Sequence, residues 1–381
     1  MCGIVGYIGS QPPVDFLIRG LRMLEYRGYD SAGVAVNDSN KKIRCVKTPG
    51  RIDVLDKLVQ EQLQPLQAAG LNGVFSGIGH TRWATHGLPT KENAHPHISF
   101  DGAVAVVHNG VIENYQTVKN ELQKKGIRFT TQTDTESITH LLAFYLKEEQ
   151  AKEESKTLSA EDLILRVVNL TLSQLHGTYG LAILFRDYPD IMVGAKFGSP
   201  LIFGIGKGES FLTSDAATLA GYTDRIITLS DHEVVCFTAS DYSLHHRDTG
   251  TVQPRIEVLD IDPSQVDKGG FEHYMLKEIF EQPEAVRNTL RGRFDYDSAT
   301  AKFGGLNLSA AQLLSVQRIM MTACGTSWHA SLVGEYQIEM LSRIPVEVEY
   351  ASELRYRNPP LDKNTLLFAL TQSGETADTL A

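Results

Sequence analysis

The sequence predicts an α+β protein whose first domain resembles a β-sandwich and whose second domain is an incomplete parallel α/β sheet. Three observations lead to this prediction. The chain has 381 residues, which is more than one ordinary core needs. Many short β signals fill residues 1–235, and the helical stretches come between them in separate batches. From residue 310 onward, a strand, a small-residue turn and a helix start occur twice, as in a parallel sheet.

Each element of the first domain follows from its local pattern. A helix is predicted at 12–26, where apolar residues recur at helical spacing, and a surface helix at 115–126, which ends at Gly126. Two more are predicted at 134–154, which begins with an acidic first turn, and at 159–177, which begins with a capping box and ends at Gly177. Strands are predicted where apolar runs lie between turn residues, at 2–8, 31–37, 73–82, 103–110, 179–185, 191–197, 224–230 and 233–237. The first domain is therefore placed at residues 1–235.

Residues 236–309 are more polar and are predicted to be a connector, with an amphipathic helix at 271–290 that breaks near Pro283. Strands follow at 315–323, 345–350 and 365–370. Residues 310–381 therefore form the amino-terminal part of a second domain, and the sequence stops at Ala381 inside an expected helix. We expect this domain to be truncated.

Composition narrows the class of protein. The formal net charge is −10 and there is no block of Lys or Arg, which argues against a nucleic-acid partner. There is no secretory leader and no apolar run of about 20 residues, so we expect a cytoplasmic protein with no membrane contact. The four cysteines lie far apart, which argues against a metal site or a disulfide framework, and no cofactor is predicted.

Cys2 is the leading candidate for a nucleophile. If Met1 is cleaved, the α-amine of Cys2 itself becomes available as a base, and its pKa of about 7.7–8.0 leaves a useful neutral fraction in the cell. A thiol needs such a base because the thiolate is the reactive form. Position alone also allows a simpler interpretation, in which Cys2 packs in an amino-terminal strand.

Six motifs in the first domain occur in one order and resemble those of the class II glutamine amidotransferases. They are MCGIVGYIG (1–9), LEYRGYDSAG (24–33), GHTRWATHG (79–87), NAHPH (93–97), VHNGVIENY (107–115) and TDTE (133–136). The resemblance implies an N-terminal-nucleophile hydrolase with a four-layer αββα sandwich. Three later motifs are similar to the glutamine–fructose-6-phosphate aminotransferase family: HYMLKEIFEQP (273–283), ACGTS (323–327) and TQSGETADTLA (371–381).

The resemblance implies that Arg82 binds the carboxylate of L-glutamine and that Asp134 binds its ammonium group. Charge-assisted pairs of this kind are worth about 1.5–3 kcal/mol. Each residue has an alternative interpretation. Arg82 could form a structural ion pair, and Asp134 could be a helix N-cap, which the local sequence favours.

The same resemblance assigns Asn109 and Gly110 to an oxyanion hole, although an Asn-Gly pair alone usually marks a turn. Cys2, Asn109 and Gly110 are thus the predicted catalytic residues. The family positions around bound glutamine correspond to Trp83, Thr85 and His86, of which Trp83 also gates the passage of ammonia. Arg27 corresponds to a residue that orders the nucleophile, and His108 is interpreted as structural.

In the second domain the resemblance implies contact with fructose 6-phosphate. The implied residues are hydroxyl and amide side chains in two turns, Thr326, Ser327, Thr371, Gln372, Ser373 and Thr376. Ordinary turn and N-cap chemistry explains either motif equally well. Family members continue beyond this point with the residues needed for ring opening and isomerisation, and full-length members are homodimers. We therefore expect glutamine hydrolysis without complete amino-sugar synthesis.

Three alternatives stay open on the sequence alone. One is a phosphoribosylamine- or asparagine-forming amidotransferase, which the motifs CGTS and TQSGET argue against. Another is a non-catalytic fragment that binds a sugar phosphate or has a regulatory role. The third is an N-terminal-nucleophile hydrolase that acts on another amide. Arg82 and Asp134 argue against it, because they favour a free amino acid as the substrate.

Overall fold

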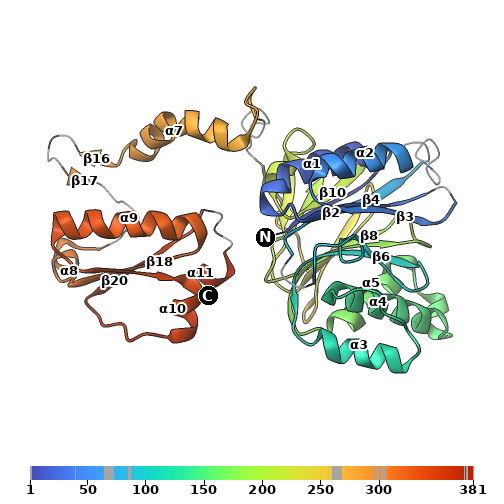
Figure 1. The fold of residues 1–381 in the computed structure, drawn as a ribbon. Coiled ribbons are helices and arrows are strands. Elements are labelled where there is room, and N and C mark those ends of the chain that lie inside the picture. Colours follow the sequence, from blue (N-terminus) through green and yellow to red (C-terminus); the bar gives the residue numbers. More distant parts are fainter. Residues whose placement is uncertain are drawn as a thin grey trace. The chain divides into compact units, whose positions relative to one another are not determined.

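The computed structural model describes residues 2–38, 40–63, 73–84, 87–259, 268–295, 297, 300–301, 306, 308–372, 374 and 376–380. The chain forms two compact units, Met1–Asp267 and Lys268–Ala381. In the first unit, two sheets lie face to face between two layers of helices (Figure 1). This confirms the predicted αββα sandwich.

The first sheet has eight strands, all paired antiparallel. In spatial order they are β15 (Glu257–Val258), β11 (Arg225–Thr228), β9 (Ile202–Ile205), β10 (Glu209–Thr213), β1 (Gly3–Gly9), β4 (Phe75–Arg82), β2 (Ser31–Asn37) and β3 (Ile43–Pro49). All seven residues of β1 are buried, because this strand lies inside the sheet and both of its faces are covered.

The second sheet has seven strands, also antiparallel. In spatial order they are β14 (Gly250–Thr251), β13 (Tyr242–His246), β12 (Glu233–Phe237), β8 (Met192–Phe197), β7 (Gly177–Phe185), β6 (Val104–Ile112) and β5 (His97–Ile98). A hydrophobic core joins the inner faces of the two sheets and includes Ile4 and Phe203 from the first and Ala105 and Leu184 from the second.

The outer faces of the sheets are covered by helices. Helices α1 (Val14–Leu24) and α2 (Ile52–Gln62) pack on the first sheet, where Phe16, Leu17 and Leu21 are buried. The second sheet is covered by α3 (Tyr115–Lys124), α4 (Asp134–Gln150) and α5 (Ala160–Leu172). Among the described residues, the short 3₁₀ helices η1 (Glu25–Arg27), η3 (Glu154–Thr157) and η4 (Ala216–Leu219) connect these elements.

The second unit contains a three-stranded parallel sheet in the order β19 (Val346–Tyr350), β18 (Arg318–Ala323), β20 (Thr365–Leu370). Its helices are α7 (Tyr274–Leu290), α8 (Ala310–Leu314), α9 (Gly325–Ser342), α10 (Ala351–Arg357) and α11 (Ala377–Leu380), and the short strands β16 (Phe294–Asp295) and β17 (Thr300–Ala301) form a ribbon. The predicted parallel sheet of an incomplete α/β domain is confirmed.

One prediction about the region 236–309 is wrong. Helix α7 continues through Pro283 instead of breaking there. Most of α7 is exposed, so water can reach the carbonyl group that the proline leaves without an N–H partner. The predicted connector also contains strands β13, β14 and β15, which belong to the sheets of the first unit.

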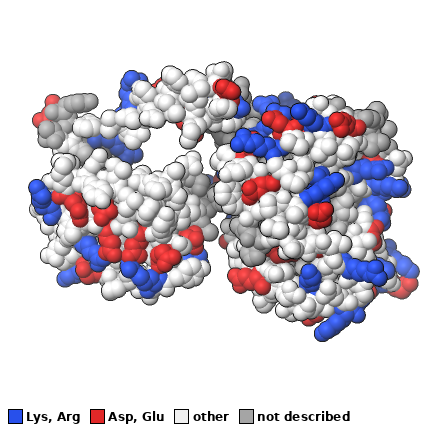
Figure 2. Space-filling model, in the orientation of Figure 1, with Lys and Arg blue, Asp and Glu red and all other residues white. Residues whose placement is uncertain are grey.

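Surface charge in both units is mixed, and Lys and Arg alternate with Asp and Glu on the face shown in Figure 2. Among the helices that the structure describes, none combines the length and the apolar character needed to span a bilayer.

Candidate active site

Cys2 lies directly before β1, where the two sheets of the first unit meet the surface. The backbone N–H of Trp83 donates to Cys2 Sγ at 3.2 Å, and the N–H of Gly3 donates to Thr81 Oγ1 at 3.1 Å. Both contacts come from the end of β4, which pairs antiparallel with β1. The thiol is therefore held at a fixed place at the amino-terminal end of β1, and it stays partly exposed.

Gly28 makes room for this arrangement. A Cβ atom at Gly28 would lie 2.7 Å from both the carbonyl carbon of Arg82 and the backbone N of Trp83. Real Cβ atoms do not approach backbone atoms this closely, so the glycine of the YRGYD motif lets this turn pack against the strand end beside Cys2.

The electrostatic surroundings of the thiol favour its protonated form. Burial raises the pKa of Cys2, while the Trp83 N–H and the Arg82 guanidinium act in the opposite direction without cancelling it. A thiol in this state needs a base before it can act as a nucleophile.

Asn109 and Gly110 reach the same region from β6 of the other sheet. Asn109 Nδ2 donates to the carbonyl O of Cys2 at 3.0 Å, and Asn109 Oδ1 lies 3.0 Å from His80 Nε2. Gly110 has φ of 132°, and a Cβ atom there would lie 2.2 Å from the carbonyl O of Thr178. Only glycine fits here, and because both residues lie within β6 and pair with β7, the interpretation of this Asn-Gly pair as a turn is wrong.

Asp134 is the first residue of α4. The N-cap position belongs to Thr133, so the interpretation of Asp134 as an N-cap is wrong. Its Oδ2 instead accepts the backbone N–H of Ile112 at 2.8 Å, and His108 Nδ1 lies 3.8 Å from the same oxygen. The carboxylate thus connects the end of β6 to the first turn of α4, where Thr135 Oγ1 donates to Asp134 Oδ1 at 3.4 Å.

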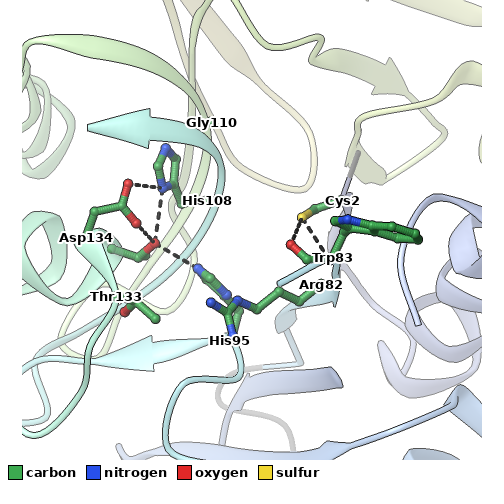
Figure 3. A pocket seen from close by; sticks show the side chains of 9 residues that line it. Cys2, Arg82, Trp83, His95, His108, Gly110, Thr133 and Asp134 are labelled. Carbon is green, nitrogen blue, oxygen red and sulfur yellow. Dashed lines mark hydrogen bonds and ion pairs between the residues drawn. The ribbon is translucent and has the colours of Figure 1, made fainter. Parts of the chain in front are cut away.

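Arg82 is the last residue of β4, and only 5% of its surface is exposed. This burial excludes the usual surface ion pair. Its guanidinium donates to the carbonyl O of Leu88 at 3.5 Å, and the side chain extends toward His95 (Figure 3). Burial lowers the pKa of Arg82, while the charges of Cys2 and Asp134 raise it, so both acidic groups act on this guanidinium.

Five of the predicted residues, Cys2, Arg82, Trp83, Gly110 and Asp134, line one cavity (Figure 3), whereas Asn109 lies beside it and bonds to the carbonyl O of Cys2. Its lining contains a thiol, a guanidinium, a carboxylate and several neutral polar groups, namely Cys2, Arg82, Trp83, His95, His108, Gly110, Thr133, Asp134 and Thr135. Trp83 is 45% exposed and packs edge-to-face on Tyr29, with 5.4 Å between the ring centroids. Such a lining suits a small zwitterion that carries a carboxylate and an ammonium group.

Arg27 does not line this cavity. It ends η1, and its Nη2 lies 2.6 Å from Asp215 Oδ2, with 9% of the side chain exposed. Asp215 in turn caps η4 by accepting the N–H of Ala217 at 3.0 Å. The pair connects the YRGYD turn to the strand end of β10, which borders β1.

A network of buried histidines and threonines supports the site, and sequence reasoning did not anticipate it. His95 Nε2 and His108 Nδ1 lie 2.8 Å and 3.0 Å from the same Thr135 Oγ1, and His97 Nε2 lies 3.0 Å from Thr133 Oγ1. Burial lowers the pKa of His95 and His97 far below the usual value, so these rings are neutral at cellular pH. The histidines in the motifs NAHPH and VHNG were the sequence signal that could have indicated this network.

Three of the predicted site residues, Thr85, His86 and Ser373, lie outside the described residues. In the second unit, Thr326 and Ser327 open α9 after β18, and Thr371 and Gln372 follow β20. The two strands are parallel neighbours, so both turns lie at one edge of the sheet. Thr371 Oγ1 is 3.4 Å from Thr376 Oγ1 and accepts the N–H of Gly374 at 3.1 Å.

No cluster of three or more His, Cys, Asp or Glu side chains suited to a metal ion occurs within the described ranges.

Two parts of the chain match models of known protein domains. Residues 72–153 match the glutamine amidotransferase domain, and residues 312–381 match the SIS domain. Among solved structures, the glutamine phosphoribosylpyrophosphate amidotransferase of B. subtilis superposes with a TM-score of 0.53 at 18% identity, covering 91% of this chain and 65% of that one. A structure described as the allosteric regulatory enzyme of purine biosynthesis gives 0.54 at 18% identity, over 99% and 91%. These likenesses concern the fold.

Sequence relatives match the chain over its whole length. The glutamine–fructose-6-phosphate aminotransferase (isomerizing) of Chlorobaculum tepidum is 44% identical over 381 residues, which is 100% of this chain and 59% of the relative. The enzyme of the same name from Bacteroides thetaiotaomicron is 43% identical with the same coverage. The whole chain is similar to this family by sequence, and it spans about three fifths of the length of these curated relatives.

Proposed function

We propose that this chain hydrolyses L-glutamine to glutamate and ammonia, with Cys2 as the nucleophile once Met1 is removed. The observation that carries the proposal is that Cys2, Arg82 and Asp134 line a single cavity although they come from three distant parts of the sequence. A guanidinium and a carboxylate on one cavity match the two charged ends of a free amino acid. Trp83 stands beside the thiol at the cavity wall.

In the proposed reaction, groups of the site accept and return every proton that is transferred. The α-amine of Cys2 takes the thiol proton, and the thiolate attacks the side-chain amide carbon of glutamine. Asn109 and Gly110 then supply N–H groups to the developing oxyanion, and Arg27 and Asp215 hold the adjoining turn. The C–N bond breaks, the proton leaves with ammonia, and water hydrolyses the thioester to give glutamate. Thr85 and His86 keep their predicted part in contacting glutamine.

Glutamate release from glutamine tests the proposal directly. Mass spectrometry of the active protein should find Cys2 as the first residue, and Cys2→Ala should abolish turnover. Activity in protein that keeps Met1 would remove the α-amine mechanism. Arg82→Met and Asp134→Asn should raise KM for glutamine more than they lower kcat, because both residues are proposed to bind substrate rather than react.

The relatives are named for amination of fructose 6-phosphate, and we propose that the second unit of this chain contributes contacts to that sugar phosphate. The proposed contacts are the turn residues Thr326, Ser327, Thr371, Gln372, Ser373 and Thr376. Because the matched region is 59% of the relatives' length, we propose that these 381 residues alone stop at glutamine hydrolysis. Glucosamine 6-phosphate formed by this chain alone would refute that statement.

A non-catalytic fragment that only binds a sugar phosphate is the competing proposal. It predicts no glutamate release from a sample in which Cys2 is the first residue. One assay that measures glutamate and amino sugar in the same sample distinguishes the two.

A further inference from the structure

His80 lies behind Asn109, in the middle of the sandwich and outside the cavity lining. It belongs to β4 of the first sheet, whereas Asn109 belongs to β6 of the second, and His80 is completely buried. Its Nε2 is 3.1 Å from the carbonyl O of His108 and 3.0 Å from Asn109 Oδ1. One ring nitrogen therefore contacts two oxygens of β6.

The carbonyl group decides which hydrogen-bonding role this nitrogen has. A backbone carbonyl oxygen only accepts, so the short distance to His108 O requires a hydrogen on His80 Nε2. The other ring nitrogen, Nδ1, is buried and has no hydrogen-bond partner among the described residues. A hydrogen placed there would be a buried donor without an acceptor, which is costly. The neutral Nε2–H tautomer is the form that satisfies both conditions.

The tautomer of His80 in turn fixes the side-chain amide of Asn109. The atom of Asn109 that faces Nε2–H has to be the acceptor Oδ1, so the NH₂ group faces Cys2, whose carbonyl O it contacts at 3.0 Å. If the amide turned over, NH₂ would meet Nε2–H and Oδ1 would meet the Cys2 carbonyl. Both contacts would then be repulsive, so the network selects one orientation.

We propose that His80 is a positioning residue that holds the Asn109 amide with its NH₂ group toward Cys2. The inference rests on the proposed glutaminase reaction, because the orientation matters only if Asn109 donates to an oxyanion there. Burial supports it further by lowering the pKa of His80 to about 3, so that the ring stays neutral across the working range of pH.

The test compares substitutions that keep or remove the donor. His80→Leu removes it, and the loss of a correctly aimed oxyanion donor should lower kcat by about 10- to 1,000-fold while KM changes about threefold or less. His80→Gln places an amide N–H close to the former Nε2 and should recover most of the lost kcat. His245→Leu is the matched control, because His245 is a partly buried histidine on β13 that does not line the cavity.

Two further measurements separate positioning from a general structural effect. Alkylation of Cys2 by iodoacetamide forms no oxyanion, so its rate should be the same in His80→Leu as in the original protein. In the Asn109→Ala background, adding His80→Leu should lower kcat about twofold or less, because the residue acts through Asn109.

The outcomes are decisive in either direction. The inference is overturned if His80→Leu keeps its kcat or if His80→Gln is as impaired as His80→Leu. It is also overturned if His80→Leu lowers kcat in the Asn109→Ala protein as strongly as it does in the original protein. If His80→Leu does not fold, the comparison passes to His80→Gln and His80→Asn, of which only the longer amide reaches Asn109 Oδ1. Equal kcat in those two overturns the inference. An original protein that releases no glutamate refutes the proposed function itself, and with it this inference.

Discussion

Glu136 offers the sharpest stability test of the structure near the site. It lies on α4 two residues after Asp134, and its carboxylate accepts hydrogen bonds from Thr130 N, Thr130 Oγ1, Thr131 N and Thr131 Oγ1 at 2.7–2.9 Å. Only 4% of the side chain is exposed, and His140 Nε2 lies 3.5 Å from Oε1. These bonds hold the segment that leads into the cavity wall at Thr133.

The magnitude of Glu136→Gln follows from this geometry. The substitution keeps the size of the side chain but turns one of the two oxygens into an NH₂ group, which faces a backbone N–H and a hydroxyl. A buried N–H without an acceptor costs about 1–3 kcal/mol, and the bonds that remain lose the extra strength of a charged acceptor. We expect the free energy of unfolding to fall by about 3 kcal/mol at pH 7.

The difference should depend on pH in a definite direction. Burial alone would raise the pKa of Glu136, but the bonds from His140 and the two threonines hold it well below the usual 4.5. A depressed carboxyl pKa stabilises the fold above the unfolded pKa and loses that effect as the pH falls. The gap between the original protein and Glu136→Gln should therefore be complete at pH 7 and shrink below about pH 4.5.

Urea unfolding of the full chain, followed by circular dichroism between pH 7 and pH 3, measures this gap. Glu148→Gln is the matched control, since Glu148 is exposed on the same helix and should change stability by less than about 0.5 kcal/mol. A Glu136→Gln protein as stable as the original at pH 7, or a gap that widens in acid, would refute the reasoning.

The other predictions concern the support of the site. Gly28→Ala should lower kcat for glutamine at least about tenfold, because its Cβ would meet backbone 2.7 Å away and move the strand end beside the thiol; unchanged kinetics would contradict this. Lys47→Met should lower the free energy of unfolding by about 1.5–3 kcal/mol, measured in urea, because Lys47 Nζ donates to three carbonyl groups of residues 92–96 at 2.7–3.3 Å. For His80, whose folded pKa of about 3 lies below the ordinary 6.5, the unfolded chain binds the extra proton, so stability should fall as the pH drops from about 6.5 toward 3. His80→Gln should flatten that part of the stability profile, and an unchanged slope would argue against a buried neutral ring.

Local sequence predicted that the strands and helices exist more accurately than it predicted where they end. The apolar pattern identified β1, β4, β6 and α1, because it is strong in each of them. It failed at Pro283, because whether a helix tolerates a proline depends on solvent reaching the freed carbonyl, and local sequence does not report exposure.

The sequence by itself determined which chemical groups are available: a thiol at position 2, an Asn-Gly pair after an apolar strand, and Arg82 and Asp134 in separate motifs. Only the tertiary structure decided that these groups lie together, because antiparallel pairing and the stacking of two sheets bring Cys2, Arg82, Gly110 and Asp134 to one cavity, with Asn109 bonded to Cys2 beside it. It also decided roles that local sequence misread. Asp134 binds the end of β6 instead of capping its helix, and His80 reaches Asn109 across the sandwich. Contacts between distant segments depend on the register and facing of strands, which no local pattern of residues specifies.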